Sequence, residues 1–261
     1  MRELGQIARK FNEMAETIAR QREKQMAFLS AVAHELRNPL GALHMATSIF
    51  EPDQSLPEEK RIRDIFAIVR RQIDHLNRMV GDLLDAYRIE SGNLELRPEE
   101  VDARELLREA RDLFKNTSAA HEISIELPET PVVVTWDSGR IGQVLNNLLS
   151  NAIKYSPAGG LVIVRLREVD TQVLIEVADY GVGIPPDDIP HIFEPFRRSG
   201  LSRQAIPGVG LGLFVAEHIV EAHAGRIQVQ SRVGVGTTFT LSMPRRASAR
   251  QIEPVATKNI A

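Results

Sequence analysis

The stretch from residue 29 to residue 43 reads LSAVAHELRNPLGAL. Its apolar residues recur in steps of three and four, which is the spacing of one face of a helix: Leu29, Val32, Leu36, Leu40 and Leu43. So narrow an apolar seam is typical of a helix that packs against other helices, and it predicts a helical bundle for this part of the chain. At about 100° per residue, His34 projects about 150° from the seam, so we expect its ring to face solvent.

The neighbours of His34 favour a chemical role over that of an ordinary surface histidine. Glu35 supplies a proton acceptor beside the imidazole, and Asn38 shares its face one turn on. Pro39 bends the helix, because it removes an N–H and clashes with the carbonyl of Glu35. On exposure alone, a histidine with no task remains the alternative. A zinc-protease motif is excluded, because Asn38 stands where a second histidine ligand is needed.

Two long helices with narrow seams begin the chain. The first seam already runs through residues 4–18, is interrupted at residues 21–25 and resumes at Leu29, which predicts a register shift between two coil segments. A second seam runs through residues 62–87, after Pro52 and Pro57, and ends at Ser91-Gly92-Asn93. One such hairpin cannot bury both seams, so we predict a homodimer in which two hairpins form a four-helix bundle.

The rest of the chain reads as short strands and amphipathic helices. Apolar and alternating runs predict strands at residues 123–127, 132–136, 161–166, 173–178, 226–230 and 237–243. Helical periodicity covers residues 103–114, 138–155 and 211–224. Residues 95–246 are therefore expected to form an α+β domain, an α/β sandwich of one mixed sheet and a helix layer, and residues 247–261 a flexible tail.

The composition excludes several classes of protein. The 261 residues carry a net charge of −3 with a pI of about 6.2, which gives no overall attraction to nucleic acid or to an anionic membrane. There is no cysteine, so disulfides, thiol catalysis, iron–sulfur clusters and cysteine zinc sites are excluded. No apolar run approaches the roughly 18 residues of a membrane span, and the chain as given is expected to be soluble.

Two asparagines and a lysine share one face of the predicted helix at residues 138–155. Asn147, Asn151 and Lys154 follow at spacings of four and three, opposite an apolar face. Asparagine is a poor interior helix residue, so two on one face indicate a role beyond solvation, which remains the alternative. An amide oxygen suits Mg²⁺, and Lys154 supplies a point charge for phosphate.

Two glycine clusters flank a basic segment. Asp179-Tyr180-Gly181-Val182-Gly183 follows a strand, where the carboxylate would accept a hydrogen bond from the amino group of adenine, although such a run also forms ordinary turns. Gly208-Val209-Gly210-Leu211-Gly212-Leu213 begins a helix and suits phosphate. Neither cluster matches a Rossmann fingerprint, and there is no Walker A motif. Between them, Arg197 and Arg198 lie in a lid-like segment that would reach phosphates, with solvation of both side chains as the alternative.

Together these stretches resemble the sequence boxes of bacterial two-component sensor histidine kinases. The resemblance covers nearly the whole chain, and five boxes occur in the order that the family has. Residues 28–40 resemble the phosphoacceptor H box, 147–155 the N box, 179–183 the G1 box, 193–196 the F box and 208–213 the G2 box. Residues 1–22 resemble the last helix of a HAMP signal relay.

The resemblance implies three regions ahead of the tail at residues 247–261. A signal-transmitting coiled-coil helix occupies residues 1–24, and a dimerisation and histidine phosphotransfer domain occupies residues 25–91. A catalytic domain at residues 95–246 has the Bergerat ATPase fold that Hsp90 shares, and residues 91–95 act as a hinge between the two domains. The chain would be the cytoplasmic part of an inner-membrane sensor protein, with membrane contact only through a missing N-terminal sensor region.

The resemblance also assigns roles to single residues. His34 would take the γ-phosphoryl group of ATP, Glu35 would act as acid or base, and Asn38 would serve dephosphorylation of the regulator. Asn151 would hold Mg²⁺. The nucleotide-binding set would comprise Asn147, Asn151, Lys154, Tyr155, Asp179, Gly181, Gly183, Arg197, Arg198, Gly208, Gly210, Leu211 and Gly212.

The implied activity is ATP-dependent autophosphorylation of His34 and phosphotransfer to an aspartate on the receiver domain of a response regulator, with regulator phosphatase activity in addition. No nucleic acid partner is expected. A scaffold that holds ATP without turnover would have a damaged box, and none is found. A plain ATPase of the Hsp90 or MutL kind would not need the box around His34. Tyr180 stands where the family often has a small or polar residue, and we expect it to narrow the pocket.

Overall fold

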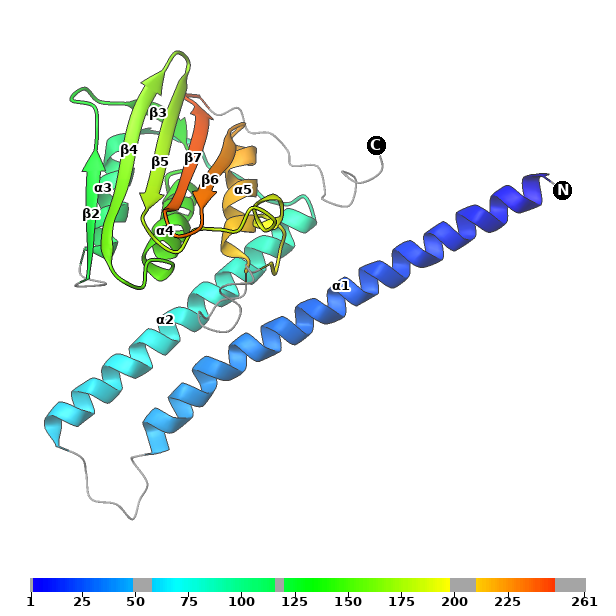
Figure 1. Ribbon diagram of the computed structural model, residues 1–261, viewed down its shortest axis with the longest axis horizontal. Coiled ribbons are helices and arrows are strands. Elements are labelled where there is room, and N and C mark those ends of the chain that lie inside the picture. The colour runs from blue at the N-terminus through cyan, green and yellow to red at the C-terminus, as the bar shows by residue number, and fades with distance from the viewer. Residues whose placement is uncertain (1, 49–57, 116–119, 198–209, 247–261) are drawn as a thin grey trace. The chain divides into compact units, whose positions relative to one another are not determined.

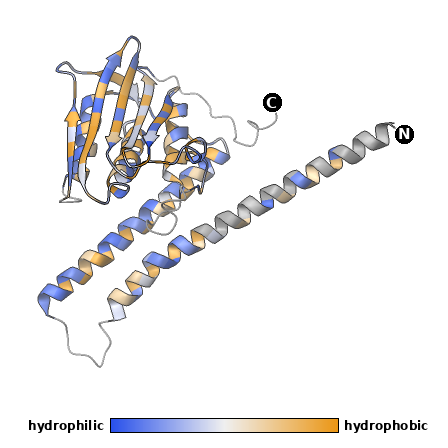
Figure 2. Cartoon of the chain, viewed as in Figure 1, coloured by the Kyte–Doolittle hydropathy of each residue, from blue (hydrophilic) through white to orange (hydrophobic). Residues whose placement is uncertain are grey.

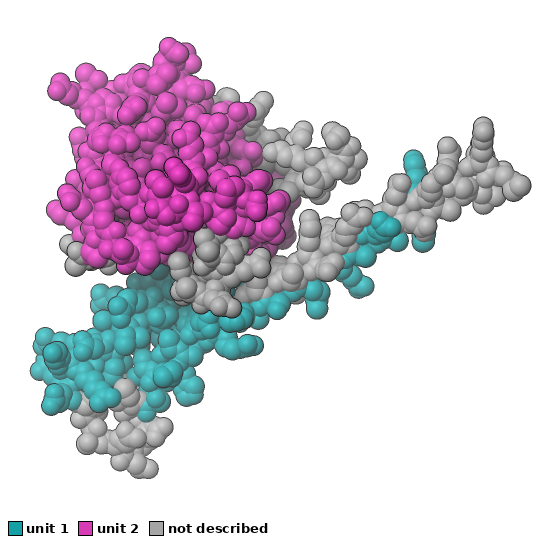
Figure 3. Space-filling view, viewed as in Figure 1, with its two compact units in different colours: residues 1–80, 207–209 teal, residues 81–206, 210–261 magenta. Residues whose placement is uncertain are grey.

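The computed structural model describes residues 2–48, 58–115, 120–197 and 210–246 (Figure 1). The chain forms two compact units, and the division between them falls between Val80 and Gly81 (Figure 3). The first unit contains helix α1 and most of helix α2, and the second contains the sheets and the other helices. Within the described ranges, no helix is both long and apolar enough to cross a membrane.

Both long helices predicted from the sequence are present. Helix α1, Arg2–Thr47, contains Pro39 and runs unbroken through residues 21–25, so the polar residues there interrupt the apolar seam but not the helix. Helix α2, Glu59–Glu90, ends where predicted. There the backbone N–H of Asn93 donates to the carbonyl of Arg88 at 2.7 Å, and Gly92 has a φ of 70°, the left-handed conformation that commonly closes a helix.

The buried row of α1 differs from the predicted leucine seam. Glu35, Pro39 and Ala46 are buried, whereas Leu40 is 54% exposed. Polar and apolar residues also alternate along α2 (Figure 2). The first unit therefore leaves part of its predicted seam uncovered, although burial of apolar surface is the main source of stability for such helices.

A five-stranded mixed sheet forms the centre of the second unit, in the order β2-β4-β5-β7-β6. The strands are β2 (His121–Glu126), β4 (Gly160–Val169), β5 (Gln172–Asp179), β6 (Arg226–Arg232) and β7 (Gly236–Pro244). Only the β2 and β4 pair is parallel. Helices α3 (Ala103–Phe114), α4 (Ser138–Lys154) and α5 (Gly212–Ala222) cover one face of this sheet (Figure 1). Side chains of β4 on that face are buried: Val162, Val164 and Leu166.

The opposite face of the sheet carries a polar ladder. The Nε of Arg165 lies 2.7 Å from the carboxylate of Glu126 on one neighbouring strand, and its Nη1 lies 3.8 Å from the carboxylate of Glu176 on the other. Glu176 is in register with Thr240 on the next strand. Successive side chains of a strand point to opposite faces, so the sheet has one apolar and one polar face.

A separate two-stranded antiparallel sheet corrects the expectation of a single sheet. Residues 132–136 were expected in the mixed sheet, but strand β3 (Val133–Trp136) pairs with β1 (Glu99–Asp102), a strand that we did not predict. The carboxylate of Asp102 accepts hydrogen bonds from the N–H of Val132 at 3.1 Å and of Arg104 at 3.0 Å. This residue therefore joins the small sheet to the first turn of α3. The side-chain hydrogen bond from Arg104 is the main cause that lowers the pKa of Asp102.

Candidate functional site

His34 lies on the exposed side of α1 in the first unit, as the sequence predicted. Asn38 is also exposed, one turn further along the helix, whereas Glu35 is only 8% exposed. This part of α1 thus presents an imidazole and an amide to solvent and holds the carboxylate in the helix packing.

The predicted stripe of α4 lies in the second unit, where Asn147, Asn151 and Lys154 are each partly buried. The helix begins at Asp137, whose carboxylate caps it by accepting a hydrogen bond from the N–H of Arg140 at 3.0 Å. The Nδ2 of Asn147 donates to the carbonyl of Gly212 at 3.1 Å and so joins α4 to the first residue of α5. Asn147 is therefore part of the packing between the two helices.

Asp179 ends β5 and is 9% exposed. Its Oδ1 accepts a hydrogen bond from the N–H of Gly181 at 2.9 Å, and the backbone N–H of Thr237 also donates to this carboxylate. Burial raises the pKa of Asp179, and the two backbone hydrogen bonds oppose that rise. An ionised carboxylate has about four acceptor positions, so this one retains capacity for a further donor such as an amino group.

Glycines let the backbone approach closely around Asp179. A Cβ on Gly181 would collide with the carbonyl of Tyr155 and lie 2.7 Å from the Oγ of Ser156. A Cβ on Gly183, where φ is 71°, would collide with the carbonyl of Arg232. The backbone N–H of Val182 donates to the carbonyl of Tyr155 at 3.0 Å. The G1-like turn thus lies between the end of α4 and the turn after β6, and packing requires both of its glycines.

The start of α5 is joined to the segment that precedes it. The N–H of Phe196 donates to the carbonyl of Gly210 at 2.9 Å, and a Cβ on Gly210, where φ is 76°, would lie 2.7 Å from the carbonyl of Arg197. Leu211, which caps α5, is 1% exposed. Two predicted site residues, Gly208 and Arg198, lie outside the described residues.

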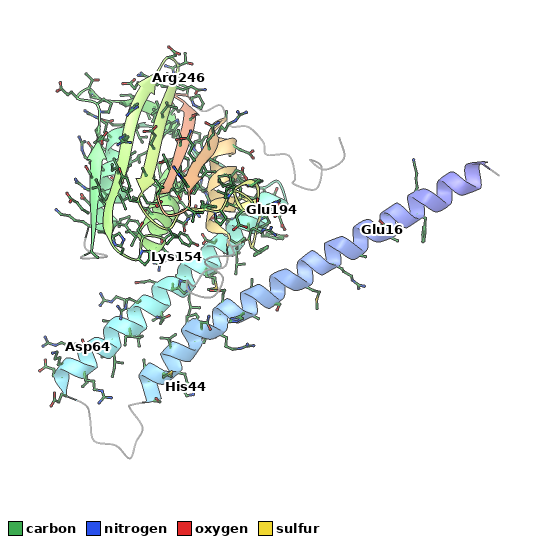
Figure 4. All side chains as sticks on the ribbon, in the orientation of Figure 1. Glu16, His44, Asp64, Lys154, Glu194 and Arg246 are labelled. Atoms are coloured by element: carbon green, nitrogen blue, oxygen red, sulfur yellow. The ribbon has the colours of Figure 1, made fainter. Side chains whose placement is uncertain are left out.

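The structure describes two of the basic side chains that were predicted to bind phosphate. The Nζ of Lys154 lies 5.4 Å from the centre of the Tyr155 ring, so the ammonium group contacts an aromatic face at the end of α4. Arg197 is exposed, and its Nε lies 4.0 Å from the carboxylate of Glu194. Figure 4 shows Lys154 at the end of α4 and Glu194 in the segment before α5.

Tyr180, which we expected to narrow the pocket, is largely exposed. Tyr180 is 62% exposed, although it directly follows the buried Asp179. Its side chain therefore lies mostly in solvent, whereas that of Asp179 is buried.

Sequence reasoning missed two polar residues near Asp179. Thr237 donates its backbone N–H to this carboxylate, and its Oγ1 lies 2.9 Å from the Oγ of Ser231. Ser156 is 4% exposed, and its Oγ has no hydrogen-bond partner among the described residues. The only local signal for either residue was a glycine immediately before the predicted strand at residues 237–243, next to Thr237. Contacts between residues so distant in sequence leave no periodic pattern.

The donor set fits a purine nucleotide with its metal. Asp179 supplies a buried acceptor, and the hydroxyl of Ser156, close to Gly181, is a buried polar group still to be satisfied. Amides at the start of α5 suit phosphate, and Lys154 adds positive charge. The amide oxygen of Asn151 is a ligand that Mg²⁺ accepts beside waters and phosphates.

Two family models match the chain. Residues 24–92 match the His Kinase A (phospho-acceptor) domain, and residues 136–247 match the histidine kinase-, DNA gyrase B- and HSP90-like ATPase. The signal transduction histidine-protein kinase/phosphatase MprB of Mycolicibacterium paratuberculosis is 34% identical over 94% of this chain and 48% of its own. Histidine protein kinase DivJ of Caulobacter vibrioides is 33% identical over 83% of this chain and 37% of its own. The chain spans about half the length, or less, of these relatives.

Solved structures show the same likeness. Histidine kinase AdeS of Acinetobacter baumannii has a TM-score of 0.62 at 27% identity, over 81% of this chain and 98% of its own. Full-length ShkA in complex with AMPPNP has a TM-score of 0.60 at 30% identity, over 85% of this chain and 46% of its own. Histidine kinase ThkA in complex with response regulator protein TrrA has a TM-score of 0.62 at 26% identity, over 87% of this chain and 64% of its own.

Proposed function

The chain belongs to the two-component sensor histidine kinases, and on that premise we propose that it phosphorylates His34 from ATP and passes the phosphoryl group to an aspartate of a response regulator. One observation carries this proposal. The same chain combines two features: an exposed histidine on a helical hairpin, and a buried carboxylate beside turns in which close packing requires glycine. A plain ATPase needs only the second of these, and a scaffold needs neither His34 nor its neighbours intact.

In this proposal the second unit binds ATP with Mg²⁺. Asp179 accepts a hydrogen bond from the amino group of adenine. Guanine has a carbonyl at that position, so the site selects adenine. Asn151 holds Mg²⁺, while Asn147 holds the start of α5 in place through its bond to Gly212. Lys154 and the arginines of the lid stabilise phosphate charge. The similarity to ShkA, whose structure is a complex with AMPPNP, supports a nucleoside triphosphate as the ligand.

The chemical step is an in-line phosphoryl transfer. A ring nitrogen of His34 attacks the γ-phosphorus, the bond from this phosphorus to the oxygen that bridges to the β-phosphate breaks, and ADP leaves with that oxygen. Glu35 accepts or shares the imidazole proton, which keeps the attacking nitrogen free. Catalysis then depends mainly on positioning and on stabilisation of charge. The phosphoryl group moves next to a carboxylate oxygen of the regulator.

A phosphatase activity toward the regulator is also proposed. Asn38 and His34 are both exposed on one side of α1, whereas Glu35 is buried. An exposed neutral amide is suited to orient water near a phosphorylated partner, because it neither repels the phosphoryl group nor removes a proton. MprB is named a kinase/phosphatase, which supports the pairing of both activities.

We further propose that the chain is a homodimer. Phe66, Ile73 and Val80 follow each other at seven-residue intervals on α2, and they are 66%, 46% and 49% exposed. A seven-residue apolar repeat is the signature of helices that pair in a supercoil. Leu40 and Met45 add exposed apolar surface on α1. A second copy of the hairpin would cover both rows and complete a four-helix bundle.

The partner and the cellular setting follow from the same proposal. The similar ThkA was solved in complex with response regulator protein TrrA, which supports a receiver domain as the partner of this chain. The first part of α1 is proposed to transmit a signal as the last helix of a HAMP relay, from a sensor region in the inner membrane. No nucleic acid partner is proposed, because the net charge of −3 provides no attraction to it.

The deciding experiment is incubation with Mg-ATP labelled at the γ-phosphate. A phosphohistidine is labile in acid and stable in base, so the label should be lost in acid and kept in base. His34→Gln should bind nucleotide normally and take no label, because the adenine site lies in the other unit. A labelled His34→Gln protein would refute the assignment, and turnover of ATP without any protein label would favour the plain ATPase.

A further inference from the structure

The division between the two compact units does not coincide with the end of α2. It falls at Gly81, inside the helix, so the last turns of α2 and the turn after it belong to the unit that contains the sheet. These turns are well buried there: Ala86 is 7% exposed, Ile89 is fully buried and Leu94 is 7% exposed. Residues 91–95, which the sequence suggested as a hinge, belong to the same unit as the sheet, with Leu94 buried and Ser91, Asn93 and Glu95 exposed.

An ion pair between a buried carboxylate and a partly buried arginine joins these turns to α4. Asp85 is 6% exposed, and its Oδ2 lies 2.8 Å from the Nη1 of Arg140 and accepts a hydrogen bond from the Nε2 of Gln143 at 2.8 Å. Arg88, on α2 itself, lies 3.6 Å from the other oxygen of this carboxylate. A buried carboxylate needs such partners, and removal of Arg140 weakens the compensation of its charge and breaks the link to α4. We name Asp85, Arg140 and Gln143 the α2–α4 clamp.

The helix that the clamp holds also carries the nucleotide residues. Arg140 and Gln143 lie in the first turns of α4, and Asn151 and Lys154 lie in its last turns. At 1.5 Å per residue, Gln143 and Asn151 are about 12 Å apart along the helix axis. Because α4 is one continuous helix from Ser138 to Lys154, the clamp links the nucleotide residues to the end of α2.

Gly81 has no packing reason to be a glycine. A Cβ at this position would meet nothing within 4 Å, unlike the glycines near Asp179. Glycine inside a helix costs about 1 kcal/mol relative to alanine, because it has more backbone freedom to lose. Its effect in α2 is therefore on the backbone, where it makes bending easier at the first residue of the second unit.

We propose that the α2–α4 clamp makes residues 82–95 a rigid part of the nucleotide unit, and that this unit turns about Gly81 to bring ATP to His34. Asp85, Arg140 and Gln143 are then positioning residues, which act through the placement of α4 and touch neither ATP nor His34. This inference rests on the proposed kinase function. It predicts that loss of the clamp slows phosphoryl transfer without weakening ATP binding.

The test uses the full chain with Asp85→Ala, Arg140→Ala and the double variant. Each single variant should lower the rate of His34 labelling about tenfold or more at saturating ATP, because small errors in position are costly for transfer, and leave ATP affinity and KM within about twofold. The double variant should be no slower than either single variant, because each of these variants loses the same contact between Asp85 and Arg140. Hydrogen exchange should show protection of residues 82–90 in the wild type and its loss in Asp85→Ala.

A matched control removes an ion pair elsewhere in the same unit. Glu126→Ala deletes a partner of Arg165 on the polar face of the sheet and should leave labelling unchanged. Unchanged labelling in Asp85→Ala would overturn the proposal, as would a parallel loss of ATP affinity, which indicates general damage to the unit. If the wild type takes no label, the proposed function fails. Hydrogen exchange then decides the clamp: unaltered protection of residues 82–90 in Asp85→Ala overturns it, and lost protection supports it.

Gly81→Ala tests the position of the bend. Alanine strengthens the helix there by about 1 kcal/mol, which corresponds to about a fivefold slower transfer if α2 must bend at residue 81. Gly142→Ala, in α4, is the matched control, because a Cβ there also meets nothing within 4 Å. Equal labelling rates in both variants would place the bend elsewhere.

Discussion

The Nε2 of His223 accepts a hydrogen bond from the backbone N–H of Asp137, 3.0 Å away. Because this nitrogen is an acceptor, the proton of the neutral ring is on Nδ1, which donates to the carbonyl of Ile219 at 2.7 Å. His223 closes α5 and is fully buried, and Asp137 caps α4. One imidazole thus ties together the two helices that carry the nucleotide residues.

This bond should make the fold sensitive to mild acid. Burial lowers the pKa of His223 below its ordinary value of 6.5, and the hydrogen bond to Ile219 and the charge of Asp137 oppose this only in part. The stability that neutral His223 contributes is therefore present above pH 6.5 and is lost as the pH falls through its lower folded pKa. Urea unfolding should show a lower midpoint at about pH 5 than at about pH 7.5. The variant His223→Phe should be less stable than the wild type at neutral pH, but its urea midpoint should fall less between pH 7.5 and pH 5. An equal fall in both proteins would contradict this role of His223.

Asp179→Asn should weaken ATP binding about tenfold to a hundredfold, the range for loss of a hydrogen bond to a charged group. The single carbonyl oxygen of asparagine has two lone pairs, which the N–H groups of Gly181 and Thr237 already use. Its amide nitrogen would face the amino group of adenine, donor against donor. Calorimetry measures the change. Asp187→Asn, at an exposed position nearby, is the control and should bind as the wild type does.

Asn151→Asp should weaken Mg-ATP by about tenfold, since it adds a negative charge beside the phosphates at the proposed metal ligand. Adenosine has no phosphates, so its affinity should stay unchanged. Titration of both ligands separates the two effects. A parallel loss for adenosine would show that α4 itself is damaged and would remove Asn151 from the proposed metal site.

Glu35 and Asn38 should separate the two activities of the first unit. Glu35→Gln keeps the volume of a buried side chain and removes the proton acceptor, so labelling of His34 should be lost. Asn38→Ala should keep appreciable labelling and lose dephosphorylation of a phosphorylated regulator. Both variants are assayed for label on His34 and for loss of label from the regulator. The opposite pattern would reverse the roles assigned to these residues.

A charge in the exposed row of α2 should break the dimer. Ile73→Glu places a carboxylate in the proposed seam and should raise the dissociation constant of the dimer about tenfold or more, as sedimentation would show. Asp74→Lys, at the next and also exposed position, changes charge outside the seam and should have a small effect. A wild-type chain that sediments as a monomer would contradict the dimer outright.

Local pattern in the sequence determined the elements of this protein and the type of chemistry that it carries. Each signal comes from residues that are close together in the sequence. These signals are the steps of three and four around His34, the polar stripe at Asn147 and Asn151, and the strand that ends at Asp179. Helix and strand periodicity are local properties, so α1 to α5 and all five strands of the mixed sheet were predictable.

Tertiary structure alone decided which distant groups meet. The contact between Asp137 and His223 spans 86 positions, and that between Asp85 and Gln143 spans 58. Neither leaves a pattern in the sequence, because each partner alone is an ordinary polar residue on a helix or at its end. The side of α1 that is buried, the second sheet of β1 and β3, and the outward Tyr180 likewise depend on packing between segments. Packing is a property of surfaces that the folded chain brings together, and periodicity along the chain does not specify it.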